Sequence, residues 1–295
     1  MALLLENSDL RIEVCDPNET AEPHLHTRFS HCGYITQIIR KKHDEQMLGQ
    51  PTEVFHPFHG SGFPDEFEIP LGYEEATCGE CFLKIGVGAE IKISDKPYSN
   101  WDEHPVTQKA HTEVLRSPDS LTFIQMAELA HIGYHYTKGI ALNGSKLVVT
   151  HALKNTGNDR WNTLWYSHVF LPIEKLQPQA ILQMNRGGKL KRNDPQMQSC
   201  SPVEVVFSTV DLDADGVCLQ WDMSDAQDNK QRLLNAHGRP IYQAEGNYPY
   251  QELQIWMNHR VFSIEPKLHI DLAPGQEKRW ETVYIWQDKN YERNN

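Results

Sequence analysis

A histidine within an aromatic segment is the first residue with the properties of a catalytic group. His168 stands in the run Leu164-Trp-Tyr-Ser-His-Val-Phe170, which leads to Pro172. Aromatic faces stack on the C–H groups of sugars, and imidazole has the unperturbed pKa closest to neutrality, so it can donate or accept a proton. A sugar site is one interpretation of this segment. A core strand with a buried histidine is the other, and it suits most of the 15 histidines in the chain.

A carboxylate that could work with this histidine lies near the end of the chain. Glu265 follows the run Val261–Ile264 and precedes Pro266. Strand alternation would place Glu265 and Ser263 on one face, opposite the apolar side chains. Because proline cannot donate to a strand ladder and disfavours a helix before it, we expect Glu265 at a strand end. Such a position can hold a catalytic group rigidly, although a solvated glutamate is the alternative.

The stretch from Gln50 to Gly79 is rich in Pro, Gly and His, and it is predicted to be the longest irregular region. Long loops inside a compact domain tend to be functional. Two glycines next to His59 let the backbone approach a ligand, and His59, Asp65 and Glu66 offer hydrogen-bonding groups. A loop without a function is the alternative.

A zinc site is a further alternative for this region. A His-x-x-His pair at 56–59 precedes a Cys-x-x-Cys pair at 78–81, and four such ligands suit Zn²⁺. Pro57 makes the backbone between the two histidines awkward, however. The His-Leu-His run at 24–26 meets a similar objection, because Arg28 nearby would repel a cation. We therefore predict no bound metal and no cofactor.

Composition and missing motifs exclude several classes of protein. The net charge is −12, from 28 basic and 40 acidic side chains, which argues against a nucleic-acid partner or an anionic membrane surface. The sequence contains no Walker A motif, no G-x-G-x-x-G and no G-x-S-x-G, so nucleotide and serine-hydrolase chemistry are not indicated.

The chain shows no sign of membrane insertion or export. No apolar run approaches the roughly 20 residues that span a bilayer, and the opening Met1–Leu5 is followed at once by acidic residues rather than a cleavage site. Six scattered cysteines do not make a disulfide scaffold. We expect a cytoplasmic protein with reduced thiols and no membrane partner. Large sandwich enzymes often dimerise, so a homodimer is one expectation, although no segment identifies an interface.

Strand-like alternation dominates the chain. The clearest examples are 121–129, 146–153 and 280–286, with turn residues between strands. Residues 134–142, the Asn143-Gly144 pair and residues 146–153 predict a β-hairpin. The segment 224–234 has the polarity of a short surface helix, and little else does. These patterns predict a large all-β antiparallel sandwich, and because nothing marks a boundary, 1–295 is expected to be one domain.

The chemical segments occur in a familiar order. His59-Gly60, Tyr166-Ser-His168-Val-Phe170, Trp256 with Val261–Pro266, and the closing Pro274-Gly275 turn together resemble the aldose 1-epimerase, or galactose mutarotase-like, superfamily. The order and spacing agree from about residue 30 to residue 286. The resemblance implies a galactose mutarotase-like β supersandwich with few short helices, acting on a small carbohydrate.

The resemblance also implies roles for individual residues. Glu265 would remove the proton of the anomeric hydroxyl and His168 would protonate the ring oxygen, which opens the ring so that it can reclose as the other anomer. His59 would bind the sugar near its ring oxygen. Arg28, Glu66 and Tyr166 complete the predicted substrate-binding set.

Departures from the family pattern leave the substrate open. The Asp65-Glu66 pair follows His-Gly where a hexose-phosphate branch has arginine, which disfavours a phosphorylated sugar. Lys84 and Lys138 would be the cations for an acidic sugar. A polysaccharide lyase using Arg28, His59 and Tyr166, and a carbohydrate-binding protein without turnover, are the two alternative functions.

Overall fold

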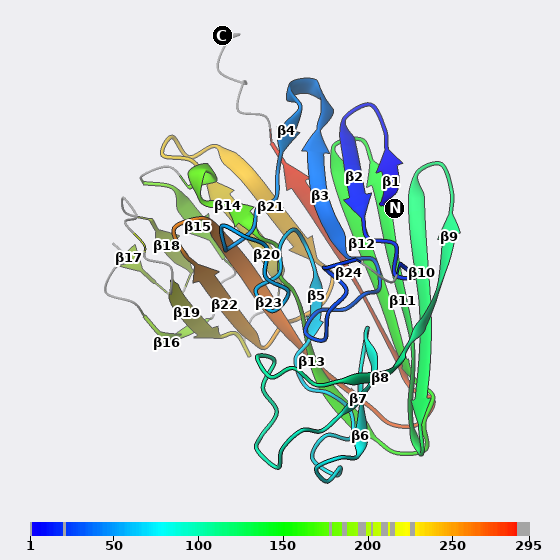
Figure 1. Cartoon of the computed structure of the whole chain (residues 1–295). Coiled ribbons are helices and arrows are strands. Elements are labelled where there is room, and N and C mark those ends of the chain that lie inside the picture. The colour runs from blue at the N-terminus through cyan, green and yellow to red at the C-terminus, as the bar shows by residue number, and fades with distance from the viewer. Residues whose placement is uncertain are drawn as a thin grey trace.

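Strands make up most of the structure, and within its described residues they form four antiparallel sheets (Figure 1). Two 3-10 helices, η1 (Lys41–His43) and η2 (Ile173–Lys175), are the helical elements of that part. This confirms the predicted all-β class. The computed structural model describes residues 2–19, 22–176, 179–184, 188–193, 199–201, 203–207, 212, 216–224 and 228–287.

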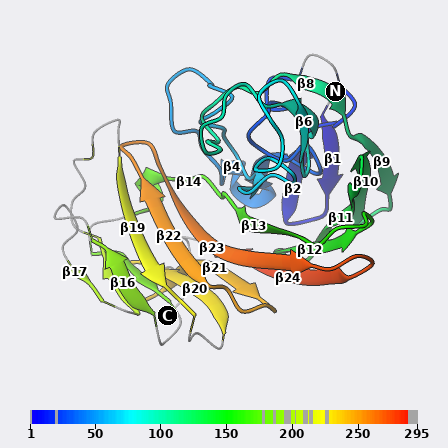
Figure 2. The same ribbon diagram turned by 90° about the horizontal axis from the view of Figure 1, so that it is seen from below.

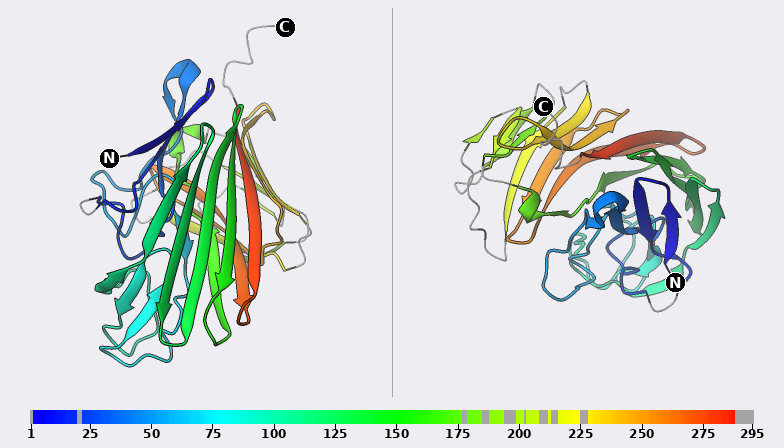
Figure 3. Two further views of the ribbon diagram at one scale, coloured as in Figure 1. Left: turned by 90° about the vertical axis from the view of Figure 1, so that its right-hand side faces the viewer. Right: turned by 90° about the horizontal axis from the view of Figure 1, so that it is seen from above.

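The largest sheet has ten strands in the described part of the chain. Its long strands stand side by side in Figure 3, left. In spatial order they are β17 (Ser199–Cys200), β18 (Glu204–Val206), β15 (Ile181–Gln183), β20 (Asn229–Leu234), β21 (Pro240–Gly246), β24 (Glu277–Trp286), β12 (Lys146–Asn155), β11 (Ile132–Asn143), β10 (Ser120–Leu129) and β9 (His111–Arg116).

The second large sheet carries the segments singled out in the sequence. Its order is β16 (Lys189–Arg192), β19 (Val217–Asp222), β22 (Glu252–Met257), β23 (Val261–Leu272), β13 (Trp161–Ser167) and β5 (Asp65–Phe67), with β14 (Leu171–Pro172) paired to β23. The central strands β22, β23 and β13 therefore lie next to one another although β13 is distant in sequence.

Two small sheets come from the first 109 residues of the chain. They lie with their loops on one side of the curved strand layers, as Figure 2 shows from below. The four-stranded sheet contains β1 (Leu3–Glu6), β2 (Leu10–Val14), β3 (Ile35–Arg40) and β4 (Glu45–Gln46), and the three-stranded sheet contains β6 (Cys81–Lys84), β7 (Gly88–Ile91) and β8 (Val106–Lys109).

Aromatic side chains fill the space between the two large sheets. Phe67 of the seven-stranded sheet meets Tyr136 of the ten-stranded sheet edge-on at 5.1 Å between ring centroids. Trp165 meets Trp280 in the same way, also at 5.1 Å. All four are buried. Large aromatic rings bury the most apolar area per residue, so these contacts hold the two layers together.

The predicted hairpin is confirmed. β11 and β12 pair in continuous register from Tyr134–Asn155 to Asn143–Lys146. Gly144 takes a φ of 57° in the turn, which a side chain would disfavour. The strands expected at 121–129, 146–153 and 280–286 also lie within β10, β12 and β24.

The predicted helix at 224–234 is wrong in its described part. Asn229–Leu234 forms β20, with alternating buried and partly or fully exposed residues. Asn229 and Gln231 point inward, and the Gln231 amide donates to the Asn229 side-chain oxygen at 2.8 Å. Two inward-facing polar residues joined by this hydrogen bond give the segment the polarity of a solvated helix, although it keeps the period of a strand. Residues 225–227 lie outside the described residues.

Two other local expectations are corrected. The irregular stretch 50–79 contains the short strand β5, which pairs with β13. Glu265 does not stand at a strand end, because β23 continues through Pro266 to Leu272. β23 pairs with β22 over 262–267 and with β13 only from 268 onwards. Pro266 thus lies where one edge of β23 has no paired β13 residue, and there a missing N–H is tolerated.

A buried ion pair links the two large sheets. The ammonium of Lys138, on β11, lies 2.6 Å from a carboxylate oxygen of Asp65, on β5, and neither side chain is exposed. Lys138 also donates to the carbonyl of Gly33 at 2.8 Å, and Ser167 donates to Asp65 at 3.1 Å.

No helix in the described residues has the length and apolar character to cross a bilayer.

Replacing Asp65 with Asn should destabilise the protein strongly, because it leaves a buried ammonium without its counter-charge. Removing one partner of a buried pair costs ~3–5 kcal/mol. The matched control is Asp271→Asn, which breaks the exposed Arg160–Asp271 pair and should cost at most ~1 kcal/mol. Urea unfolding measures both. Equal losses in the two variants would contradict the interpretation of Asp65.

Candidate functional site

The register of β13 sorts its side chains onto two faces. Tyr166 lies opposite Glu66 and Ser167 opposite Asp65. Because neighbouring residues in a strand point to opposite faces, Ser167 and Asp65 face the core while Tyr166 and Glu66 face the other side. His168 follows two residues after Tyr166, and its backbone N–H donates to the carbonyl of Pro64 at 2.8 Å. We call this second side of the seven-stranded sheet the site face.

β23 and β22 bring further polar groups to the site face. Glu265 pairs in register with Gln254, and Ser263 pairs with Trp256. Lys267 stands two residues after Glu265 and so shares its face. Alternation within the two strands therefore assembles a carboxylate, an ammonium, an amide and an indole beside His168.

The structure brings the predicted pair together. Nε2 of His168 lies 3.4 Å from Oε1 of Glu265, and both side chains are buried. Nδ1 of His168 and Oε1 of Glu265 have no hydrogen-bond partner. Buried polar atoms usually have one, so two unsatisfied atoms on facing groups suit a site that binds a further molecule.

An amide chain orients the carboxylate. The Gln254 amide donates to Oε2 of Glu265 at 2.9 Å, and Gln220 donates to the Gln254 oxygen at 2.9 Å. One carboxylate oxygen is therefore held by β22, while Oε1 faces His168. This fixes which oxygen can exchange a proton with a bound molecule.

Burial sets the protonation of the pair. It raises the pKa of Glu265 to about 7, although Lys267 and Arg28 act in the opposite direction. Burial, assisted by Arg28 and Lys267, lowers the pKa of His168 well below its ordinary value. Both shifts favour the neutral forms, as expected for groups removed from water. Near pH 7 the imidazole is neutral and Glu265 can hold or release a proton.

A second cluster is built around Glu66. Its Oε2 accepts from Nε of Arg28 at 3.0 Å and from the hydroxyl of Tyr166 at 2.6 Å, while its Oε1 accepts from the amide of Asn100. Arg28 also donates to the carbonyl of Phe58 at 2.6 Å. Of the predicted binding residues, Arg28, Glu66 and Tyr166 are thus brought together, bound to one another.

Aromatic rings enclose the Arg28 guanidinium. Its central carbon lies 4.5 Å from the ring centroid of Phe29 and 4.6 Å from that of Trp101. The His59 ring meets Trp101 edge-on at 5.2 Å. His59 is thus in contact with Trp101, and its contact with a sugar stays a prediction. Trp101 is 57% exposed, which leaves most of the indole free to contact a molecule from solvent.

Rings also surround the catalytic candidate. Phe170 stacks on His168 with centroids 4.0 Å apart, and Phe29 and Trp256 stand edge-on to it at 6.0 and 6.3 Å. These apolar neighbours exclude water from one side of the imidazole. They contribute to the burial that, together with the charges of Arg28 and Lys267, lowers its pKa.

Comparison with known proteins identifies the fold. No protein-family model and no curated protein matches the chain. Solved structures do. A galactose mutarotase related enzyme from Lactobacillus acidophilus aligns over 100% of both chains, with 14% identity and a TM-score of 0.65. A galactose mutarotase-like protein from Lactobacillus casei covers 97% of this chain and 100% of its own, at 11% identity and a TM-score of 0.63. The chain has the galactose mutarotase-like fold.

A eukaryotic protein shares this galactose mutarotase-like fold. An aldose epimerase homologue from C. elegans covers 98% of this chain and 100% of its own, with 11% identity and a TM-score of 0.55. The coverage confirms the predicted architecture along the chain. Identities this low concern the fold and leave the roles of individual residues to the site itself.

The lysines considered for an acidic sugar are engaged elsewhere. Lys138 is paired with Asp65 between the sheets. Lys84 is buried and donates to the hydroxyl of Tyr98 at 2.9 Å. Lys267, which the sequence analysis did not single out, donates to Glu68 at 2.8 Å with its ammonium 4.8 Å from the Tyr166 ring. Each cation therefore has a partner within the protein.

The Cys₂His₂ alternative is not supported by the geometry. Among the described residues, which include all four candidate ligands, no three of His56, His59, Cys78 and Cys81 bring their ligand atoms together. His56 and Cys78 are exposed. The ligand atoms that do lie close together belong to Cys15, Glu22 and His24.

Several site residues had no distinctive sequence signal. Alternation alone could have placed Lys267 beside Glu265. Gln254 and Gln220 depend on the register of β19, β22 and β23. Asn100 and Trp101 lie in the loop between β7 and β8, where no pattern points to Glu66 or Arg28.

Glu265→Gln should make the protein more stable above pH 7. A group whose pKa is raised on folding contributes full stability below its unfolded pKa and loses it as the pH rises through the folded value, here about 7. A neutral amide avoids this loss, so the variant should gain roughly 2–3 kcal/mol more at pH 8 than at pH 5. Thermal melts at both pH values test it, with the exposed Glu128→Gln as control. A pH-independent difference would contradict the buried carboxyl.

Proposed function

We propose that the protein interconverts the anomers of an aldose or a sugar derivative, with Glu265 and His168 as its acid–base pair. The observation that carries this proposal is the facing pair itself. Two buried groups lie 3.4 Å apart, and each keeps one buried atom without a hydrogen-bond partner. The galactose mutarotase-like fold supports the reaction class, and the named relatives include a mutarotase related enzyme.

The reaction needs one base and one acid. Glu265 takes the proton of the anomeric hydroxyl while His168 gives a proton to the ring oxygen, so the bond from the anomeric carbon to the ring oxygen breaks and a carbonyl forms. Rotation about the neighbouring carbon–carbon bond exposes the other carbonyl face. Reclosure returns both protons, and no atom is gained or lost. Each group must therefore act in both directions.

A single transferable proton on the pair is sufficient. In the sugar-free protein that proton lies on Glu265, since burial raises its pKa to about 7 and lowers the pKa of His168. The form with Glu265 ionised and His168 protonated is reached by transferring this one proton. The form with ionised Glu265 and protonated His168 opens the ring. Opening converts the pair to the form with protonated Glu265 and neutral His168, and that form closes the ring. Glu265 as base and His168 as acid thus describe one half of a reversible cycle.

The charge arrangement favours a neutral sugar. Arg28 is bound to Glu66 and Lys267 to Glu68. A phosphate or a uronate would have to compete for these cations with carboxylates that are already in place. For the same reason a lyase that uses Arg28 and Tyr166 on a uronate is disfavoured, since both donate to Glu66. Trp101 and Trp256 offer aromatic faces to sugar C–H groups.

Loss of either member of the pair should slow catalysis strongly. His168→Ala and Glu265→Gln are each expected to lower the rate of anomer interconversion by ~10²–10⁴-fold, the usual contribution of a positioned acid or base. Polarimetry on a panel of neutral aldoses measures the rate, and His269→Gln, an exposed position on β23, is the matched control. Full activity in both variants on the best sugar would rule out the assigned roles. A sugar that raises the melting temperature without any interconversion would favour a binding protein.

The pH profile should report the one-proton pair. Activity requires pH above the depressed pKa of His168 and below the pKa of Glu265, so kcat/KM should fall as pH rises through about 7. Measuring kcat/KM between pH 5 and 9 shows this limb. A profile that stays flat from pH 6 to 9 would contradict a Glu265 proton in the working state.

Three broader assignments stay predictions. They are a single domain over 1–295, a cytoplasmic location and a homodimer. We retain them with the proposed enzyme, whose partner is a small carbohydrate.

A further inference from the structure

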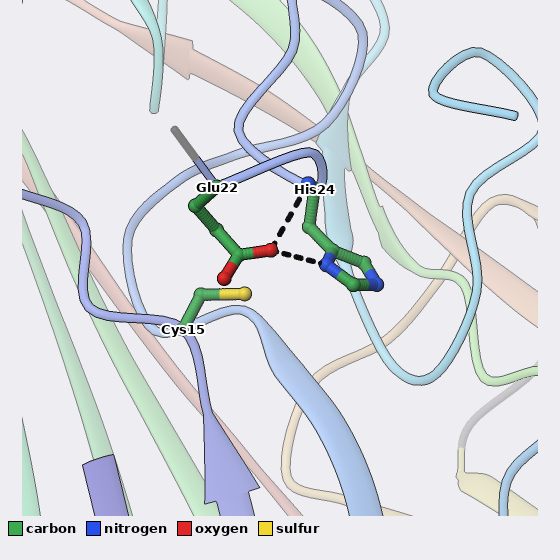
Figure 4. Close-up of side chains that lie close together, drawn as sticks. All are labelled: Cys15, Glu22 and His24. Carbon is green, nitrogen blue, oxygen red and sulfur yellow. Dashed lines mark hydrogen bonds and ion pairs between the residues drawn. The ribbon is translucent and has the colours of Figure 1, made fainter. Parts of the chain in front are cut away.

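A second group of reactive side chains lies outside the acid–base pair. Cys15 directly follows β2, and Glu22 and His24 lie in the segment between β2 and β3. Figure 4 shows the three side chains turned toward one another. Their thiol sulfur, carboxylate oxygen and imidazole nitrogen all lie within 4.8 Å of one another. In the described part of the chain, no other group of three His, Cys, Asp or Glu side chains has this geometry.

The imidazole is held from both sides. Nδ1 of His24 lies 2.6 Å from Oε1 of Glu22, and Nε2 lies 3.0 Å from the hydroxyl of Ser61. Ser61 is fixed by Tyr34, whose hydroxyl donates to its carbonyl at 2.9 Å. Histidines that bind metals usually donate their second ring N–H to an oxygen, which sets the tautomer and ring direction. Here Nε2 can make that second contact with Ser61, so Nδ1, which now faces Glu22, is the nitrogen that a cation would take.

The three groups combine a buried thiol with a wetter side. Cys15 is 1% exposed and packs with Phe29 and Phe170. The side chains of Glu22 and His24 are 26% and 19% exposed to solvent. A cation bound here would contact protein on the thiol side and water on the other.

We propose that Cys15, Glu22 and His24 form a binding site for a divalent transition-metal cation of the Zn²⁺ class. The thiolate sulfur, a Glu22 oxygen and Nδ1 of His24 are the protein ligands, and water completes the coordination. Thiolate and imidazole together select against Mg²⁺ and Ca²⁺. In a tetrahedral site with bonds near 2.1 Å the nitrogen and oxygen ligands stand ~3.4 Å apart. His24 and Glu22, now in contact at 2.6 Å, must therefore separate by less than ~1 Å.

Charge and protons balance in this site. The cation takes the place of the Cys15 thiol proton, which is released to solvent. The proton that a neutral His24 carries on Nδ1 toward Glu22 moves to Nε2, where the Ser61 hydroxyl accepts its hydrogen bond. The thiolate and the Glu22 carboxylate then neutralise the two positive charges. From the sequence we predicted no bound metal, in part because Arg28 would repel a cation near His24. In the structure the Arg28 charge is neutralised by Glu66 at 3.0 Å, which removes that objection.

The site would tie the N-terminal segment to the end of β2. Arg28, which binds Glu66, follows His24 by four residues, and Phe29 packs in the same cluster as Cys15. The cation would therefore help to hold the segment that carries Arg28 over the site face. Metal binding itself does not depend on the sugar chemistry, so its test is separate from that of the proposed function.

Zn²⁺ titration of the full chain, without a histidine tag and freed of metal by a chelator, tests the site. Calorimetry should show one ion per chain, with about one proton released when buffers of different ionisation enthalpy are compared. Cys15→Ser and Glu22→Gln should each weaken binding at least ~10-fold, because losing even an outer-shell partner of a metal ligand costs that much. Cys81→Ser and the exposed Glu252→Gln are matched controls that should bind as the wild type does.

Cobalt substitution identifies the thiolate directly. Co²⁺ bound to the wild type should give a near-ultraviolet thiolate-to-metal band that is absent in Cys15→Ser. If that buried substitution prevents folding, the Glu22→Gln affinity decides, since that side chain is partly exposed. Two results would overturn the site: equal ion affinity in the wild type and in Glu22→Gln, or Co²⁺ binding to the wild type without the thiolate band. The three groups would then be a hydrogen-bond chain only.

Discussion

The register of β13 against β5 is the constraint on which the rest of the molecule depends. It places Asp65 and Ser167 toward the core and Glu66 and Tyr166 toward the site face. A slip of one residue would exchange the two sets. The Asp65–Lys138 pair opposes such a slip, because a buried ammonium would lose its counter-charge. Core packing and site chemistry are therefore fixed by the same backbone pairing.

Charge on the site face is balanced unevenly, and that imbalance creates the reactive group. Arg28 is matched by Glu66 and Lys267 by Glu68, each at hydrogen-bond distance. Glu265 has an amide partner instead of a cation in contact. Burial without a close counter-charge keeps its carboxyl partly protonated near neutral pH. The paired ions thus act as scaffold, and the carboxylate without a cation in contact is left for proton transfer.

The N-terminal third contributes to both candidate sites. Its loops supply Arg28 and Phe29 to the site face, and the same apolar cluster that contains Phe29 buries Cys15. A ligand bound at Cys15, Glu22 and His24 would act on the segment that leads into Arg28. The two sites share packing but use different chemistry, proton transfer in one and coordination in the other.

The sequence determined what can be read from local alternation and residue type: the all-β class and the β11–β12 hairpin. The pairing of His168 with Glu265 as acid–base candidates came from the resemblance of several segments to the aldose 1-epimerase superfamily. It failed for residues 229–234, where two inward-facing polar side chains share a hydrogen bond inside a strand and give the segment the polarity of a solvated helix. It also failed to predict that the strand continues through Pro266. A proline is tolerated there because only one edge of β23 is paired at that position, and the pairing depends on strands that are distant in sequence. Only the tertiary structure decided that Gln254 orients Glu265, that Glu66 holds Arg28, and that Cys15 meets His24. Those contacts join segments whose separation in sequence carries no periodic signal, and burial, which sets their protonation, exists only in the folded chain.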